Sequence, residues 1–459
     1  MLTMREARDR GRLLRETTPR SAHAELTLPD RDPVAILVEQ NENRLANLIP
    51  VRIGRMLLSP FAYYRGTAAV MAHDLSTDRV TGEQVVSCGD AHISNFGLFA
   101  SPERRVLFDL NDFDETSIAP WEWDVKRLAA SVVIGGRDRG LSEPQCRDAA
   151  QSAVRAYRET LQEMHRMSAL ERYFYQVETD WVETVAKAKD RSIVRKKIET
   201  ARRRTSEQVR DKLVAADEHG SLRFIDAPPT TRHVPHPTMD LVQQLFAQYC
   251  ATVRSDTAYL LTQFKVVDYV LRAVGVGSVG TRCYVVMLEG PSRVPLFLQV
   301  KEAPPSVLET YGRRPLVMPE GMTSVRRGKQ AHRVVSGQRI LQAQSDPFLG
   351  WIAAWKDPER RRPADYYWRQ FRDMKGSVRL ELLTQSQYAS YVGLCGRLLA
   401  RAHSQSPGGA VIVGYLGKSE RFEQAVAAWS VAYANQVERD FTALSAAVRT
   451  GRLPAEQGV

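Results

Sequence analysis

Two short apolar runs, each followed at once by an acidic loop, constrain the fold of this chain more than any other feature. Residues 84–87 form the first run, and Cys88-Gly89-Asp90-Ala91-His92-Ile93-Ser94-Asn95 follows it. Residues 106–108 form the second run, which leads into Asp109-Leu110-Asn111-Asp112-Phe113-Asp114-Glu115. Apolar runs of this length, ended by glycine or polar residues, predict buried strands. We therefore expect two strands whose ends bring carboxylates and a carboxamide together.

The residue types in these loops are typical of a site for a metal ion and a phosphate group. Asp90 and Asn95 have the spacing found in the catalytic loop of phosphotransferases, where the aspartate accepts a proton from the acceptor and the asparagine holds a metal. Hard oxygen ligands of this kind suit Mg²⁺, and Asp109 and Asp112 are both candidate ligands from the second loop. The alternative is that Asp and Asn simply occupy turns, as they often do.

A glycine-rich turn and a lysine form a second group of candidate residues. A β-rich run at 266–274 precedes Gly275-Val276-Gly277-Ser278-Val279-Gly280, and further strands are expected at 283–288 and 296–300, the last ending at Lys301. In a dinucleotide fold such glycines open a helix, whereas here they join two strands. A glycine-rich hairpin over phosphates, followed by a strand that carries lysine, is the arrangement of protein kinases. The alternative is an ordinary meander with a surface lysine.

The rest of the chain is predicted to be mainly helical. Apolar spacing predicts helices within residues 1–50, 67–75, 120–131, 143–217, 330–344, 388–403 and 422–448, and further strands at 348–352 and 366–371. Proline-rich residues 226–237 are interpreted as a linker. Asp124 lies in the first turn of a predicted helix, where it either caps the helix or braces the loop of Asp90 from behind.

Composition limits the compartment and the partners. Apolar residues make up 43% of the chain and charged residues 25%, as in soluble globular proteins, and no apolar run approaches the ~18 residues of a membrane helix. Five scattered cysteines without a CxxC pair, and a charged start, predict a cytoplasmic protein. The net charge of +11 is densest at 191–204, where we expect a solvated helix face rather than a nucleic-acid surface.

The chain closely resembles the bacterial family of domain of unknown function 2252 over nearly its whole length. The motifs that carry this resemblance are Ser59-Pro60-Phe61, Arg65-Gly66, Gly89-Asp90-Ala91-His92, Asn95-Phe96-Gly97, residues 108–115, residues 275–281, Gln299-Val300-Lys301-Glu302-Ala303 and Arg369-Gln370. The family by itself implies no activity. It is similar to the protein-kinase-like superfamily, above all the aminoglycoside phosphotransferase and choline kinase branch. Those enzymes have H-G-D-x-x-x-x-N where this chain has Cys88-Gly89-Asp90 through Asn95.

The resemblance implies an α+β, protein-kinase-like two-lobe fold that is circularly permuted and has additional helices. In those kinases the glycine-rich loop and the lysine precede the catalytic loop, whereas here they follow it. We expect the cut to come after the helix that normally feeds the catalytic loop, and a glycine hairpin lying away from Asp90 and Asp112 would contradict this. The expected regions are 1–225 (C-lobe-like, with the catalytic loop), 226–258 (linker and lead-in helix), 259–385 (β-rich, nucleotide-binding) and 386–459 (helices that complete the C-lobe).

The same resemblance implies ATP and Mg²⁺ as cofactors. Asp90 and Asn95 would be catalytic, and Asn95 would also bind Mg²⁺ together with Asp112, which is favoured over Asp109 by its more kinase-like distance from Asp124. Gly275, Gly277, Ser278, Gly280 and Lys301 would hold the nucleotide. Glu309 is chosen as the partner of Lys301, because the predicted helix at 330–344 contains no glutamate.

Three functions remain open at this point. The first is transfer of phosphate from ATP to an unknown small molecule or protein. The second is transfer of AMP, if the nucleotide lies reversed. The third is a catalytically silent protein that binds a nucleotide or nucleic acid. The joint presence of Asp90, Asn95, Asp112 and Lys301 favours an enzyme.

Overall fold

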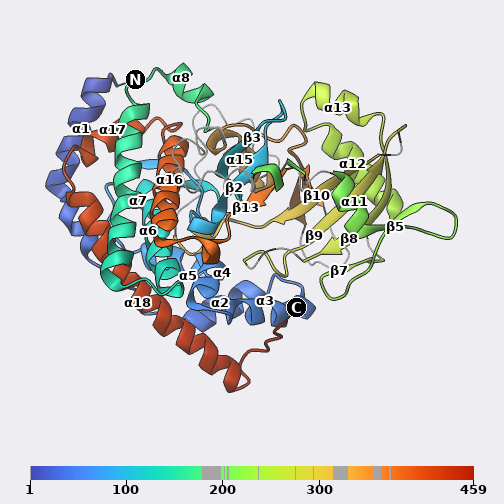
Figure 1. Cartoon of the computed structure of the whole chain (residues 1–459), viewed down its shortest axis with the longest axis horizontal. Coiled ribbons are helices and arrows are strands. Elements are labelled where there is room, and N and C mark those ends of the chain that lie inside the picture. The colour runs from blue at the N-terminus through green and yellow to red at the C-terminus, as the bar shows by residue number, and fades with distance from the viewer. Residues whose placement is uncertain are drawn as a thin grey trace.

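A computed structural model describes most of the chain as two adjoining halves, one mainly helical and one built on a sheet (Figure 1). The described residues are 2–177, 198–200, 202–203, 206–235, 237–273, 275, 277–292, 294–313, 329–355, 363–371 and 374–458. Most of the basic stretch at 191–204 lies outside them. The fold is a mixed α and β one with several antiparallel sheets, which confirms the α+β prediction at this level.

The helical half is framed by four long helices, and the two predicted at 388–403 and 422–448 agree with the structure to within three residues at each end. The helix predicted at 120–131 extends to 138, while the helix that begins at 143 ends at 164 and the expected helical tract to 217 contains a strand at 214–216. The four helices are α6 (Trp121–Asp138), α7 (Glu143–Met164), α16 (Gln385–His403) and α18 (Arg421–Arg449). Helix α16 begins at a capping box, in which the Thr384 hydroxyl accepts from the Gln387 N–H and the Gln387 side chain accepts from the Thr384 N–H. Shorter helices surround the frame: α1 (Met4–Thr17), α2 (Pro33–Asn41), α3 (Ile49–Met56), α4 (Pro60–Gly66), α5 (Ala68–Leu75), α8 (Ala169–Phe174) and α17 (Gly409–Leu416).

The other half is built on a six-stranded antiparallel sheet in the order β11-β12-β10-β9-β8-β7. Its strands are β7 (Thr231–Arg232), β8 (Lys265–Arg272), β9 (Cys283–Glu289), β10 (Pro295–Ala303), β11 (Gly350–Trp355) and β12 (Ala364–Gln370). The predicted strands and the helix α15 (Lys329–Leu341) between β10 and β11 are thus confirmed. The sequence missed β7, which pairs with β8 from within the predicted linker.

The two faces of this sheet are covered by different segments. Alternate side chains point to opposite faces of a strand, and Val285 and Phe297 accordingly pack against residues of α11 (Ser206–Leu213) and of the hairpin β5 (Val214–Ala216)–β6 (Leu222–Phe224). The alternate side chains of the same strands pack on the other face of the sheet against α12 (Met239–Cys250), which is followed by α13 (Ser255–Leu261). The expected region 1–225 therefore includes a segment that packs on the sheet of the other half.

Two small sheets lie where the halves meet and carry the acidic loops. Strand β1 (Gln84–Ser87) pairs with β4 (Ser117–Pro120), while β2 (Phe96–Ala100) pairs with β3 (Val106–Leu110) and β13 (Gly376–Ser377). The predicted strands at 84–87 and 106–108 are confirmed; β3 is buried throughout, and β1 is buried at alternate residues. Among the described residues, no helix combines the length and apolar character that crossing a membrane requires.

Candidate functional site

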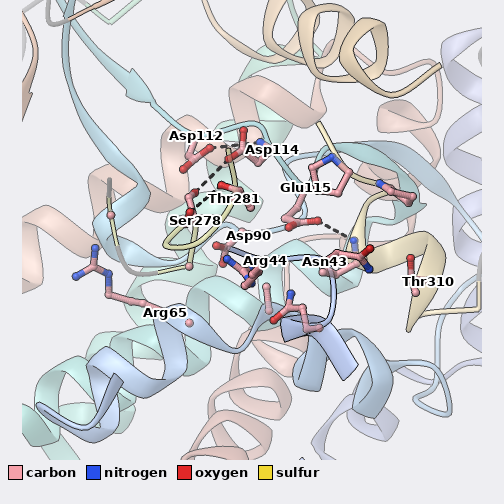
Figure 2. A pocket seen from close by; sticks show the side chains of 18 of the residues that line it. Asn43, Arg44, Arg65, Asp90, Asp112, Asp114, Glu115, Ser278, Thr281 and Thr310 are labelled. Carbon is pink, nitrogen blue, oxygen red and sulfur yellow. Dashed lines mark hydrogen bonds between the residues drawn. The ribbon is translucent and has the colours of Figure 1, made fainter. Parts of the chain in front are cut away.

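A cavity of about 390 Å³ brings together segments that are far apart in the sequence (Figure 2). The two acidic loops contribute Asp90, Asn95 and Asp112 to its wall. The glycine turn between β8 and β9 contributes Gly275, Gly277 and Ser278, and helices of the helical half contribute Arg65 among other residues. The expected juxtaposition of the glycine hairpin with Asp90 and Asp112 is therefore present.

Asp90 is held in place by an arginine from helix α6. The Arg127 guanidinium donates from Nε to Asp90 Oδ1 at 2.9 Å and lies over the Tyr64 ring, with its other end bonded to the Tyr64 carbonyl. His92 Nε2 lies 3.7 Å from the second carboxylate oxygen of Asp90. Arg127 therefore holds Oδ1 of Asp90, while Oδ2 lies beside His92. The sequence analysis assigned no role to Arg127, although its position one helical turn after Asp124 is a signal that could have identified it.

Asp124 braces the loop of Asp90 from behind, which is one of the two roles predicted for it from the sequence. Its two carboxylate oxygens accept from the backbone N–H groups of Cys88 at 2.7 Å and Gly89 at 2.9 Å, and His403 Nε2 lies 3.1 Å from Oδ2. Gly89 has a φ of +78°, and a Cβ atom there would lie 2.1 Å from the Glu115 carbonyl oxygen. Only glycine therefore suits this turn.

Asn95 and Asp112 present oxygen atoms that suit Mg²⁺. The Asn95 amide nitrogen donates to the carbonyls of Asp90 and Asp112, both at 3.0 Å, which fixes the amide so that Oδ1 remains for a cation. The Asp112 carboxylate lies on the same cavity wall. Within the described ranges, no group of three or more His, Cys, Asp or Glu residues is arranged to hold a metal. Mg²⁺ in phosphate-transferring sites commonly takes only one or two carboxylates and completes its shell with phosphate and water, so these residues fit it.

Asp109 is directed away from the cavity. Its Oδ1 accepts from the Leu110 N–H and its Oδ2 accepts from the Ala343 N–H, both at 2.8 Å. The side chain is buried, and it is not part of the cavity wall. Burial raises the pKa of its carboxyl group. Of the two candidate metal ligands, the geometry therefore favours Asp112.

Lys301 pairs with Asp114, a residue that the sequence analysis did not identify as a site residue. The buried ammonium on β10 donates to Asp114 Oδ2 across 187 sequence positions and lies 3.4 Å from the Ser278 hydroxyl. Tyr367 on β12 donates to the other Asp114 oxygen at 2.5 Å. Burial raises the pKa of Asp114, but Lys301 outweighs this effect and holds the pKa below its usual range. This ion pair joins the sheet half to the helical half at the cavity.

The expected pair between Lys301 and Glu309 is wrong. Glu309 instead lies 3.7 Å from Nε of Arg333, a buried residue of helix α15. The Arg333 guanidinium donates to the carbonyls of Asp114 at 2.9 Å, of Thr116 and of Pro304. Helix α15, which follows the strand of Lys301, therefore carries Arg333, which fixes the backbone of the second acidic loop. The same loop supplies Asp114, the partner of Lys301.

The glycine turn is fastened to the start of the helical half. Arg44 donates to the Val279 carbonyl at 2.5 Å, the Leu45 N–H donates to the Gly280 carbonyl at 2.8 Å, and Arg55 donates to the Gly275 carbonyl at 2.6 Å. These contacts give Gly280, which has a φ of +89°, a role in holding the turn beside the cavity. The sequence offered no signal for this fastening, because its donors lie more than two hundred positions away.

Glu115 is a titratable group of the cavity wall with a shifted pKa. Its Oε2 accepts from the Val307 N–H at 2.7 Å. Burial raises the pKa of this carboxyl group to about 7, and the Val307 hydrogen bond opposes the shift. The cavity therefore contains a carboxyl group that is partly protonated near neutral pH.

The chain belongs to the bacterial family described as "Uncharacterized protein conserved in bacteria (DUF2252)", which it matches over residues 44–447. The match covers both acidic loops, the glycine turn and Lys301, so the resemblance drawn from the motifs is confirmed. No curated protein and no solved structure matches the chain.

Proposed function

We propose that this protein is an ATP- and Mg²⁺-dependent phosphotransferase with a circularly permuted protein-kinase-like fold. The observation that carries the proposal is the meeting of Asp90, Asn95 and Asp112 with the glycine turn at one cavity, where Lys301 bonds to Asp114 and Ser278 of the wall. These are the residue types that phosphoryl transfer needs for acceptor, metal and phosphates. Chance placement of an isolated motif would not bring both sets together.

The order of elements supports the permuted fold. A glycine turn after β8, a lysine on β10, then a helix and two strands follow the order of a kinase small lobe. In a kinase the chain would next enter the catalytic loop. Here α16 ends at His403, which contacts Asp124 behind the loop of Asp90. The helix and the loop are thus neighbours in space although they are separate in sequence, as a circular permutation requires.

In this mechanism the acceptor hydroxyl binds at Asp90 Oδ2. Its oxygen attacks the γ-phosphorus, the bond to the bridging oxygen breaks so that ADP leaves, and the hydroxyl proton passes to Asp90. Lys301 and the N–H groups of the glycine turn stabilise negative charge on the phosphates. Asn95 and Asp112 would hold Mg²⁺, which supplies charge neutralisation between the phosphates when it is bound.

Ligand-dependent thermal stability of the full chain tests the nucleotide site. ATP with Mg²⁺ should raise Tm, and a ligand at 100 times its Kd adds about 2.7 kcal/mol. Lys301→Met and Asp112→Asn should each abolish the Mg²⁺-dependent part of this shift. Lys265→Met on β8, where the side chain is 74% exposed, and Asp256→Asn, 63% exposed, are the matched controls and should keep it.

Labelled ATP then identifies the group that is transferred. Label from the γ-phosphate should move to an acceptor, whereas movement of α-label would replace phosphate transfer by AMP transfer. Absence of any Mg²⁺-dependent shift at millimolar ATP would contradict the enzyme proposal and favour a silent binding protein.

A further inference from the structure

A second cavity of about 430 Å³ opens beside the loop of Asp90. It shares Arg65 and Ser94 with the first cavity, and Ser94 lies in the same loop as Asp90. The rest of its wall comes from α4, from the end of α6 and from the segment after β13. A molecule in this cavity would thus reach Asp90 past Ser94, from a side that the glycine turn does not cover.

Two arginines of this cavity have unsatisfied buried nitrogen atoms. The Arg65 side chain makes no hydrogen bond or ion pair with any described residue, and its Nε is buried without a partner. Arg139 donates from one end to the Leu383 carbonyl and lies over the Tyr388 ring at 5.2 Å, yet its Nε is also buried without a partner in the described part of the chain. Figure 2 shows Arg65 at the edge of the first cavity, apart from Arg44.

These two arginines differ from Lys301 and Arg127, because neither Arg65 nor Arg139 is paired with a carboxylate among the described residues. Lys301 is paired with Asp114, and Arg127 is paired with Asp90. A buried polar group without a partner costs free energy, and a guanidinium is well suited to bind a carboxylate or phosphate through two parallel hydrogen bonds. The geometry therefore leaves Arg65 and Arg139 ready for an anion from outside the chain.

The remaining charges of the cavity lie at its exposed mouth. Asp138, Glu381 and Arg379 are exposed residues of the wall. Charges in contact with water are screened, so each of them contributes less to anion binding than a charge on the inner wall. The inner wall is therefore positive and the mouth is mixed, which favours an anion over a cation.

We propose that the second cavity is the acceptor subsite and that it takes an alcohol bearing a phosphate or carboxylate group, bound by Arg65 and Arg139 with its hydroxyl at Asp90. This proposal rests on the proposed phosphotransferase function. It specifies that the acceptor is anionic. Anion binding by the two arginines can be measured without any phosphate transfer.

Titration of the full chain with inorganic phosphate, monitored by ³¹P NMR, tests directly whether the two arginines bind an anion. Wild type should bind phosphate saturably, both alone and with Mg²⁺ and a non-hydrolysable ATP analogue present. Arg65→Gln and Arg139→Gln should each weaken binding about tenfold, which corresponds to about 1.4 kcal/mol. Arg137→Gln, two residues before Arg139, is the matched control and should leave binding unchanged, because Arg137 pairs outside the cavity with Glu143 and Glu438. Competition by acetate distinguishes a carboxylate site from a phosphate site.

Several results would overturn this proposal. The first is the absence of saturable phosphate binding, and the second is equal phosphate binding by wild type and Arg139→Gln. The third is loss of phosphate binding when the nucleotide analogue is added, because this loss would assign the arginines to the nucleotide. If the buried variants do not fold, Arg379→Glu reverses an exposed charge at the mouth and should weaken binding severalfold; no effect would count against the subsite. Phosphate binding without an ATP-induced thermal shift would retain the anion site and reject the phosphotransferase.

Discussion

The ion pair between Lys301 and Asp114 gives the sharpest test of how the two halves are joined. Lys301→Met keeps most of the apolar stem but leaves the Asp114 carboxylate without its cation. Removing one member of a buried ion pair commonly costs about 3–5 kcal/mol. Asp114 would keep its hydrogen bond from Tyr367 and is 20% exposed, so we expect the lower end of this range, about 3 kcal/mol.

Urea unfolding at pH 7 measures this loss, provided that the slope with denaturant stays unchanged. The double variant Lys301→Met/Asp114→Asn removes both charges, and its loss should be smaller than the sum of the single losses by about 2 kcal/mol. Lys265→Met, which breaks only an exposed pair with Glu289 at 3.6 Å, should cost less than about 1 kcal/mol. Additive single effects, or a loss below about 1 kcal/mol for Lys301→Met, would refute a buried, coupled pair.

Three further predictions concern the surroundings of the site. Glu115→Gln should stabilise the fold more at pH 8 than at pH 4.5. The pKa of Glu115 in the folded protein, about 7, lies above the ordinary value of 4.5, so ionisation of the wild-type carboxyl group between these values costs stability. Urea unfolding across this pH range measures the difference in unfolding free energy between variant and wild type, and a difference that stays constant with pH would contradict the raised pKa. Asp124→Asn should lower stability by about 1–3 kcal/mol and reduce turnover, because one of its two loop contacts loses its acceptor; full stability in thermal unfolding would contradict the bracing role. Gly89→Ala should destabilise the protein more than Gly82→Ala, since both need a positive φ but only Gly89 meets another atom within 4 Å, and equal Tm values would contradict this close approach.

The local pattern of the sequence determined the elements that carry the site. Short apolar and β-rich runs predicted the strands that lead to Asp90 and carry Lys301, because the residues of a buried strand are themselves apolar. Apolar spacing likewise predicted α16, to within three residues at its start. The position of Asp124 in the first turn of a helix was enough to suggest its bracing role, which the contacts with Cys88 and Gly89 confirm.

The tertiary structure alone decided which charges meet. Glu309 was predicted to pair with Lys301 because the predicted helix at 330–344 contains no glutamate, yet Asp114 of the acidic loop pairs with the lysine and Arg333 lies beside Glu309. Likewise, Asp109 and Asp112 lie three positions apart in one loop, but only Asp112 reaches the cavity, since the strand end holds Asp109 against Ala343.

The physical reason is the range over which each interaction acts. Hydrogen bonds within a helix or hairpin join residues near in sequence, so their signals can be read locally. An ion pair, or a hydrogen bond that holds a turn in place, depends on which distant segments fold together. The hydrogen bond from Arg44 to the Val279 carbonyl, for example, spans 235 positions of the sequence. The sequence therefore determined the residues that could form the site, and the packing of the two halves determined which of them form it.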